Sequence, residues 1–236
     1  MSEPRTATEQ AYAGIVNLIL TGNLRPGERT SVKLLAGRLG LGRTPVKEAI
    51  TRLETEGVFS VAGRSGTTVK GIDAEEARQI FALRQMLEDF AAAEAVRNIE
   101  PAEIETLREL LGELAETSLG ERHGLVSAAR FVRANVAFHA AIVAAAHNPN
   151  LDRLYAQIQL QVQIVSYLLL RGDNVDAARL RQKEHEAILE ALETRDAELL
   201  RQRLRAHSEV TEQEILRALD TSGEDAETPD TVETVL

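Results

Sequence analysis

Three histidines, His139, His185 and His207, fall on separate predicted helices and have apolar neighbours on the same helical face. Asn135 lies four residues before His139, so the two side chains project from one face about one turn apart. Imidazoles that converge from three helices can form a binding centre. The alternative is that each histidine is a hydrogen-bonded core or boundary residue, because helical periodicity alone does not establish convergence.

Arg84 is a second group with the chemistry to bind a ligand. It lies beside Ile80, Phe81 and Leu87 on a predicted helix, so its side chain is expected to point inward. A buried guanidinium needs an anionic partner. Glu88, four residues later on the same face, is the candidate partner within the chain.

The elements that position these groups belong to a chain of 236 residues, 44% of them hydrophobic. That length suggests one or two domains with a real hydrophobic core. The sequence contains no long apolar run, no apolar signal region near its first residues and no cysteine. Membrane spans, disulfides and cysteine metal ligands are therefore excluded, and a cytoplasmic location is expected.

Charge is distributed unevenly along the chain, which carries a net charge of -10. Residues 1–71 contain ten Lys and Arg against six Asp and Glu, whereas the remainder has 17 basic and 31 acidic residues. This asymmetry fits a small DNA-binding domain joined to a larger acidic body. The acidic body would repel phosphate, so DNA contact is expected in the N-terminal part alone.

The N-terminal part has the pattern of a winged helix-turn-helix, a unit that reads duplex DNA. Two amphipathic segments meet at a turn bracketed by Gly40 and Gly42, and Thr44 is expected to cap the second one ahead of Pro45. A small hairpin follows. The predicted elements are helices over 10–21, from Ser31 and from Thr44, and strands over 59–62 and 67–71.

A basic surface is predicted around the start of the helix that begins near Thr44, the third helix of the chain. Arg43 lies at the helix entrance, where a guanidinium can donate two hydrogen bonds to guanine O6 and N7. Glycines at the hairpin tip let its backbone approach a groove. The alternative is that these charges are merely solvated. The predicted DNA-binding residues are Lys33, Arg43, Thr44, Lys47, Arg64 and Gly66.

From about residue 73 the pattern becomes helical almost throughout, which predicts an all-α bundle and a mainly α fold class. Residues 220–236 contain six acidic residues and no basic ones, so they are predicted to be a disordered acidic tail. The predicted domains are 1–72 and 73–219. The predicted helices of the bundle cover 74–98, 101–118, 126–147, 150–171, 174–194 and 196–219.

The run LILTGNLRPGERTSVKLLAGRLGLGRTPVKEAITRLETEG resembles the DNA-binding domain of the GntR family of bacterial transcription regulators. Its most specific pieces are 24–27 and 43–49. The resemblance implies that Lys33, Arg43, Lys47 and Gly66 contact operator DNA. Lys33 and Lys47 stand where arginine is more usual, and lysine cannot form the planar bidentate fork.

Residues 75–215 resemble the FCD ligand-binding domain of the FadR subfamily, through NVAFH at 135–139, HEAIL at 185–189 and the later histidine. The resemblance implies a divalent metal site formed by Asn135, His139, His185 and His207, with Zn, Ni or Mn as candidates. It also implies that Arg84 and Asn135 bind the effector in an all-helical effector-binding domain.

Asn135 stands where this family usually has aspartate, which leaves the metal charge uncompensated by its protein ligands. An anionic effector can supply that charge by binding the metal. Alternatively, the site is metal-free and binds its ligand by hydrogen bonds alone.

The leading hypothesis is a ligand-responsive transcription regulator that is not an enzyme. It is expected to act as a homodimeric repressor on a near-palindromic operator and to respond to a small organic acid. The main alternative is a metal-dependent hydrolase with an accessory DNA-binding domain, because a histidine cluster with an open position can activate water. A third reading is a constitutive, ligand-free architectural DNA-binding protein.

Overall fold

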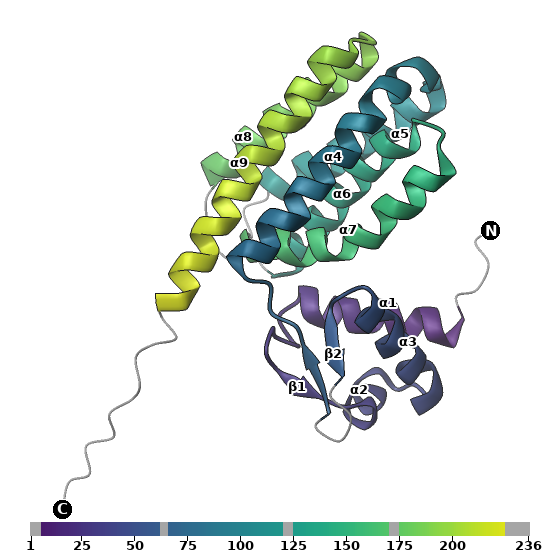
Figure 1. Ribbon diagram of the computed structural model, residues 1–236, viewed down its shortest axis with the longest axis vertical. Helices are drawn as coiled ribbons and strands as arrows, with labels where there is room; N and C mark the ends of the chain where they lie inside the picture. Colours follow the sequence, from purple (N-terminus) through teal and green to yellow (C-terminus); the bar gives the residue numbers. More distant parts are fainter. Residues whose placement is uncertain (1–5, 62–65, 120–124, 170–174, 225–236) are drawn as a thin grey trace, which may run out of the picture.

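The computed structural model describes residues 6–61, 66–119, 125–169 and 175–224. Within these ranges the chain forms a small N-terminal part, with three helices and a three-stranded sheet, and a bundle of six helices (Figure 1). This architecture confirms the predicted fold class, a winged helix-turn-helix followed by an all-α bundle. The two parts touch along α1 of the first and α6 and α7 of the second.

The N-terminal helices are α1 (Ala7–Leu20), α2 (Val32–Leu39) and α3 (Arg43–Thr55). A capping box between Thr6 and Glu9 starts α1, three residues before the predicted start. The prediction that Thr44 caps α3 was wrong, because the cap is Gly42. Gly40 ends α2 in a left-handed conformation, and only three residues, 40–42, separate α2 from α3.

The wing is a three-stranded sheet formed by β1 (Arg29–Thr30), β2 (Phe59–Val61) and β3 (Thr67–Val69). The strands lie in the order β1-β3-β2, with β3 in the middle. Both pairings are antiparallel, with Thr30 opposite Thr67 and Phe59 opposite Val69. The hairpin was predicted from the sequence, whereas β1 was not. A strand of two residues is too short to show an alternating pattern.

Apolar stripes along α1, α2 and α3 form most of the core of the N-terminal part. Leu160 and Ile164 of α7 join this core from the bundle, and they attach the wing unit to it. A separate contact packs Leu20 of α1 against Val132 of α6. The buried stripe residues of the three helices are Ala11, Ile15, Ile19, Leu35, Ala36, Val46, Ala49, Ile50 and Leu53.

The bundle helices begin and end close to the predicted positions. One difference is α9, which continues to Glu224 and makes residues 220–224 helical instead of part of the predicted tail. Extending a formed helix adds one hydrogen bond per residue and needs no new nucleus. Residues 225–236 lie outside the described ranges. The helices are α4 (Ala74–Asn98), α5 (Pro101–Leu119), α6 (Leu125–Ala144), α7 (Pro149–Leu169), α8 (Val175–Glu193) and α9 (Ala197–Glu224).

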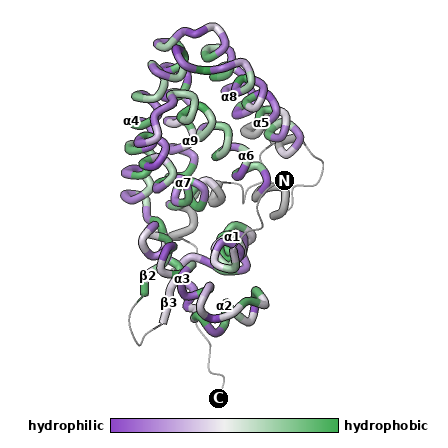
Figure 2. The backbone as a smooth tube through the Cα atoms, turned by 90° about the vertical axis from the view of Figure 1, so that its right-hand side faces the viewer, coloured by the Kyte–Doolittle hydropathy of each residue, from purple (hydrophilic) through white to green (hydrophobic). Residues whose placement is uncertain are grey.

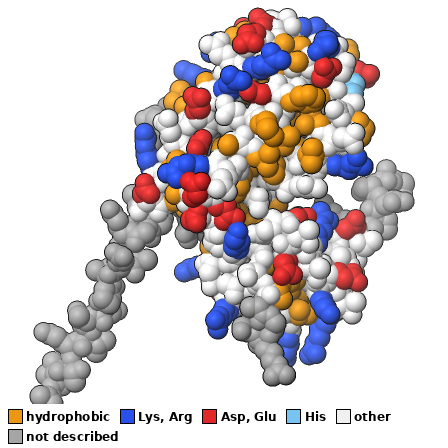
Figure 3. Space-filling view, viewed as in Figure 1, with side chains coloured by type: hydrophobic (Ala, Val, Ile, Leu, Met, Phe, Trp, Pro, Cys, Tyr) orange, Lys and Arg blue, Asp and Glu red, His pale blue; other side chains and the backbone are white. Residues whose placement is uncertain are grey.

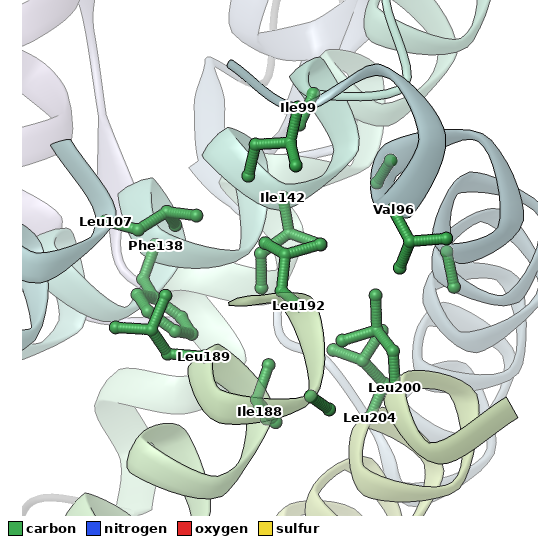
Figure 4. Packing of buried hydrophobic residues seen from close by; sticks show 14 of the residues in the cluster. Val96, Ile99, Leu107, Phe138, Ile142, Ile188, Leu189, Leu192, Leu200 and Leu204 are labelled. Atoms are coloured by element: carbon green, nitrogen blue, oxygen red, sulfur yellow. The ribbon is translucent and has the colours of Figure 1, made fainter. Parts of the chain in front are cut away.

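Apolar side chains from five of these helices fill the middle of the bundle. Phe138 and Ile142 of α6 meet Leu189 and Leu192 of α8 there, with Leu107 of α5 beside them (Figure 4). Hydrophobic and hydrophilic residues alternate along the helices of both parts, as amphipathic packing requires (Figure 2). A group of buried polar side chains interrupts this pattern next to the core.

Candidate functional site

The three histidines come together inside the bundle. His139 projects from α6, His185 from α8 and His207 from α9, and all three side chains are buried. The ring centres of His185 and His207 are 4.5 Å apart, and those of His139 and His207 are 5.1 Å apart. One ring nitrogen from each histidine lies within 4.8 Å of the others, so the three rings can share one ion or one ligand atom.

Asn135 joins this histidine cluster from the turn of α6 before His139. Its Oδ1 accepts a hydrogen bond from Nε2 of His185 at 2.8 Å. Two ligands bound to one transition metal at about 2.1 Å and at right angles lie about 3 Å apart. The observed separation therefore suits a direct hydrogen bond and also two neighbouring metal ligands.

A buried charged network lies beside the histidine cluster. Oε1 of Glu88 accepts hydrogen bonds from Nε of Arg84 at 2.8 Å and from the hydroxyl of Tyr155 at 2.6 Å. Nδ1 of His139 lies 3.2 Å from the same oxygen. Burial opposes the ionisation of Glu88, but the charge of Arg84 outweighs it and holds the pKa of this carboxyl below its ordinary value. Glu88 therefore remains an anion.

Arg84 has more donors than this network uses. Its side chain is fully buried, yet neither Nη1 nor Nη2 has a hydrogen-bond partner among the described residues. Buried guanidinium groups normally have all their N–H groups paired, since an unpaired donor costs about 1–3 kcal/mol. Arg84 is therefore paired with Glu88, as predicted, through Nε. Its two Nη atoms remain available to donate hydrogen bonds to a further anion or to water.

The histidines are held in the neutral form. Burial lowers the pKa of His139, and it lowers the pKa values of His185 and His207 further, with added repulsion from neighbouring positive groups. Neutral imidazole is the form that binds a metal. Nδ1 of His207 lies 2.8 Å from a carboxylate oxygen of Glu184, which leaves Nε2 directed away from that contact.

The donor set fits a divalent transition metal. Nε2 of His139 and Nε2 of His207 have no hydrogen-bond partner in the part of the chain that the structure describes. Together with His185 and the oxygen of Asn135 they would supply three nitrogens and one oxygen, a combination that Zn, Ni and Mn accept. A metal held there would act as a Lewis acid toward an anionic ligand.

A small cavity with a volume of about 20 Å³ lies against this cluster. It has room for an ion or about one water molecule, so an organic acid must displace neighbouring side chains to enter. Arg181 contributes a second buried guanidinium, which pairs with Glu214 and has an unpaired Nε among the described atoms. The cavity is lined by Phe131, Val132, Asn135, Ser166, Arg181, His207 and Thr211.

Sequence reasoning did not assign three residues of this site, Arg181, Glu184 and Tyr155. Arg181 carried a usable signal, because it lies four residues before His185 and so on the same face of α8. Glu184 precedes that histidine directly, but adjacent helical positions do not share a face, and its contact runs to α9. Tyr155 reaches Glu88 across 67 residues of sequence, and the contact of Glu88 with His139 also joins separate helices.

The predicted DNA-binding residues lie on the N-terminal part. Lys33, Arg43, Thr44 and Lys47 are exposed, and none of the three basic residues forms an ion pair with a described residue. Figure 3 shows Lys and Arg side chains at the end of this part that faces away from the bundle. Arg64 lies outside the described residues.

Gly66 begins the second arm of the wing. Its φ is +94°, a conformation that favours glycine, and an added Cβ would lie 3.4 Å from the carbonyl oxygen of Thr30. The structure therefore explains a glycine at this position by backbone conformation.

A winged helix with an exposed basic third helix, joined to a helical bundle with a buried polar centre, is typical of a DNA-binding regulator with a second, all-helical domain. Comparison with protein families supports this class. The bacterial regulatory proteins of the gntR family match residues 7–69, and the FCD domain matches residues 79–210. The chain belongs to the GntR family of transcription regulators and carries an FCD domain.

The similarity to individual members of the family extends over most of the length of each relative. The chain is 29% identical to the HTH-type transcriptional regulator YdhC of Bacillus subtilis, over 88% of this chain and 90% of the relative. It is 31% identical to McbR of Escherichia coli, over 81% of this chain and 84% of the relative. The solved structure of E. coli McbR/YncC superposes with a TM-score of 0.77 at 27% identity, covering 93% of this chain and 100% of that one.

These relatives decide between two of the readings that the sequence left open. Members of the family are transcription regulators and not enzymes, so the hydrolase alternative has no support. In the described part of the chain, no helix is long and apolar enough to span a membrane.

Proposed function

We propose that this regulator is a repressor whose operator binding is modulated by a small organic acid held in the bundle. Residues 1–72 would serve as the DNA-binding domain and 73–219 as the effector-binding domain. The observation that carries the proposal is the buried centre in which unpaired donors of Arg84 lie beside a cluster of neutral histidines. Repression is supported by a relative from Paenarthrobacter nicotinovorans, described as a probable D-xylose utilization operon transcriptional repressor and 28% identical over 86% of this chain.

The chemistry of the centre favours a carboxylate ligand. Arg84 can donate two parallel hydrogen bonds to a carboxylate, a geometry that lysine does not offer. Asn135, His139, His185 and His207 would hold a divalent metal that carries no charge compensation from these ligands. An anionic effector near the metal and Arg84 supplies that compensation, so metal and effector are expected to bind more tightly together than apart.

A direct packing contact connects this centre to the DNA-binding domain. Val132 of α6 lines the cavity and also packs against Leu20 of α1. Because the cavity is too small for an organic acid as it stands, occupancy requires α6 or its side chains to move. Such a movement changes the surface that α1 rests on, and therefore the placement of the recognition helix.

At the DNA, Arg43 would read a guanine edge, while Lys33, Lys47 and Thr44 contact bases or phosphates around it. Arg64 and Gly66 would place the wing tip along the adjacent sugar-phosphate backbone. A homodimer would set two recognition helices in successive major grooves of a near-palindromic operator. Because it would act on duplex DNA, we expect the protein to work in the cytoplasm.

The metal proposal is tested by metal analysis of the purified protein after exposure to Zn, Ni or Mn and dialysis. His207→Ala should lose the bound ion, whereas wild type retains about one per chain. His147→Ala is the matched control, because His147 is exposed and pairs with Glu103 outside the cluster. Equal retention by wild type and His207→Ala would reject the metal site.

The effector proposal is tested by calorimetric titration with acetate, succinate and citrate, with and without the metal. Arg84→Lys keeps the charge next to Glu88 but lacks the fork, so affinity for the binding acid should fall about tenfold. Arg97→Lys on the exposed face of α4 is the control and should bind normally. If none of a broad panel of carboxylates binds wild type, the ligand class is wrong, while operator binding would remain as a separate result.

A further inference from the structure

Arg181 of α8 is a second buried guanidinium at the centre of the bundle, and the proposed function leaves it without a role. Only 8% of this residue is exposed. Its Nη1 donates a hydrogen bond to a carboxylate oxygen of Glu214 on α9, a helix that packs beside α8 (Figure 1). Its Nε is buried and has no partner among the described residues. Because buried N–H groups are normally paired, Arg181 has a donor available for a ligand.

The unpaired Nε of Arg181 belongs to a residue that lines the small cavity beside the histidine cluster. Ser166 of α7 and His207 of α9 line the same cavity. Oγ of Ser166 and Nε2 of His207 are also buried without a partner in the described part of the chain. Arg181 and Ser166 can each donate a hydrogen bond, while Nε2 of His207 is a proposed metal ligand. Positive charge and two donors around one cavity favour an anionic group as its occupant.

The two buried arginines contact the histidine cluster through different neighbours. Nε of Arg84 donates to Glu88, whose Oε1 lies 3.2 Å from Nδ1 of His139, and Arg84 is not among the residues that line the cavity. Arg181 lines the cavity together with His207, whose ring centre lies 5.1 Å from that of His139. Burial lowers the pKa of His207, and Arg84 and Arg181 are among the positive groups that lower it further. Both guanidinium groups therefore act on one centre from separate positions.

Glu214 is the partner that a ligand would displace from Arg181. Of its side chain 26% is exposed, against 10% for Arg181, so the carboxylate lies closer to solvent than the guanidinium. Thr211, three residues earlier on the same face of α9, lines the cavity, which places Glu214 near the cavity wall. A partly exposed carboxylate regains water when it turns outward, so its release costs less than that of a fully buried one. Glu214 is therefore a side chain that can give way when an organic acid enters.

We propose that the effector is a dicarboxylate, one carboxylate of which binds at Arg84 while the other replaces Glu214 on Arg181. The inference rests on the proposed function and names the class of organic acid. The present partner of Arg181 is itself a carboxylate, so the guanidinium is already placed to pair with this group. A divalent metal on the three histidines and Asn135, all neutral, would retain two positive charges, and a dicarboxylate balances both. Glu214 then acts as an internal competitor that pairs with Arg181 when no ligand does.

Calorimetric titration of the full-length protein, with and without zinc, tests the ligand class. The probes are the straight-chain dicarboxylates from malonate to adipate, each compared with its own half-amide, in which one carboxylate is a carboxamide of the same shape. The dicarboxylate that binds best should bind about tenfold more tightly than its half-amide, because only the charged group forms an ion pair with Arg181. Equal affinity for the two would overturn the inference and leave an organic acid effector in place. Binding of no carboxylate at all would contradict the proposed function as well.

Substitution of Arg181 tests the position of the second carboxylate. Arg181→Met should lower the affinity for the dicarboxylate about tenfold and the affinity for its half-amide much less. Arg203→Met, which removes an exposed arginine of α9, is the matched control and should bind both ligands as wild type does. Equal weakening of both ligands in Arg181→Met would assign Arg181 a structural role and overturn its contact with the effector.

Glu214→Gln tests the competition and should tighten binding. A neutral amide oxygen is a weaker partner for a guanidinium than a carboxylate is, so the affinity for the dicarboxylate should rise several-fold. Glu209→Gln removes the same charge from an exposed position on α9 and should bind as wild type does. In the background of Arg181→Met, Glu214→Gln should give no gain, whereas general repulsion of the ligand by Glu214 would persist there. An unchanged or lower affinity in Glu214→Gln, or a gain that persists without Arg181, would overturn the role of Glu214.

Discussion

The DNA-binding surface and the buried centre of the bundle use polar side chains in opposite ways. Arg43 and Lys47 are exposed and have no ionic partner among the described residues, so they are available to a large external ligand. Arg84 is buried, and one of its nitrogens is paired with Glu88. We expect a residue of the first kind to contribute to binding and little to folding, and a residue of the second kind to contribute to both. Substitutions should therefore separate the two functions of the protein.

Removal of Glu88 is expected to have the largest effect. Glu88→Ala leaves Arg84 buried without its anion, and we expect the free energy of unfolding to fall by about 3–5 kcal/mol, as measured by urea denaturation. Glu94→Ala on the same helix removes an exposed pair with Arg97 and should cost less than about 1 kcal/mol. Similar losses in both variants would show that the buried network carries no special weight.

Arg43→Ala should produce the reverse pattern. Operator binding should weaken by about 1–3 kcal/mol, because a base-reading arginine is lost, while the free energy of unfolding changes little. Binding is measured by fluorescence anisotropy at fixed salt. Arg108→Ala, which removes an exposed arginine of the bundle, controls for the change in net charge. Unchanged operator affinity in Arg43→Ala would remove Arg43 from the recognition surface.

Leu20→Ala tests whether the two regions communicate through α1 and α6. The change in operator affinity caused by the effector should shrink by about 0.5–2 kcal/mol, because the contact with Val132 is lost. The coupling is obtained from operator titrations with and without saturating effector. Leu24→Ala is the control, since Leu24 is equally buried but belongs to the N-terminal core instead of the cluster that joins Leu20 to Val132. It should lower stability and leave the coupling intact.

Gly66→Ala should have the smallest effect. A residue with a side chain is strained at a φ of +94°, so we expect a loss of about 1 kcal/mol in the free energy of unfolding. Gly71→Ala is the matched control, because an added Cβ there meets nothing within 4 Å and its φ is not positive. Chemical denaturation of both variants makes the comparison. Equal stability of the two would show that the wing tip relaxes without cost.

The sequence predicted the secondary structure closely where local signals were strong. The limits of α4 agreed with the prediction at both ends, because Asp73 caps its start and Pro101 begins the next helix. The sequence did not predict the two-residue strand β1, and it placed the cap of α3 and the end of α9 at the wrong residues. Each of these depends on a neighbouring element or on the absence of a stop signal.

The candidate site divides in the same way. Helical periodicity was sufficient to identify His139, His185 and His207 as inward residues and to suggest Glu88 as the partner of Arg84, because these relations lie within single helices. The contacts of Tyr155 with Glu88 and of Glu184 with His207 join different helices. No spacing within one helix encodes them.

The sequence by itself therefore determined the class of protein, the basic recognition helix and the inward faces of the bundle helices, since propensity, capping and periodicity act over a few residues. Only the tertiary structure decided that three histidines share one centre, that two nitrogens of Arg84 have no partner among the described residues, and that Val132 contacts both the cavity and α1. The physical reason is that helix packing sets distances between segments that the local rules of the backbone leave free.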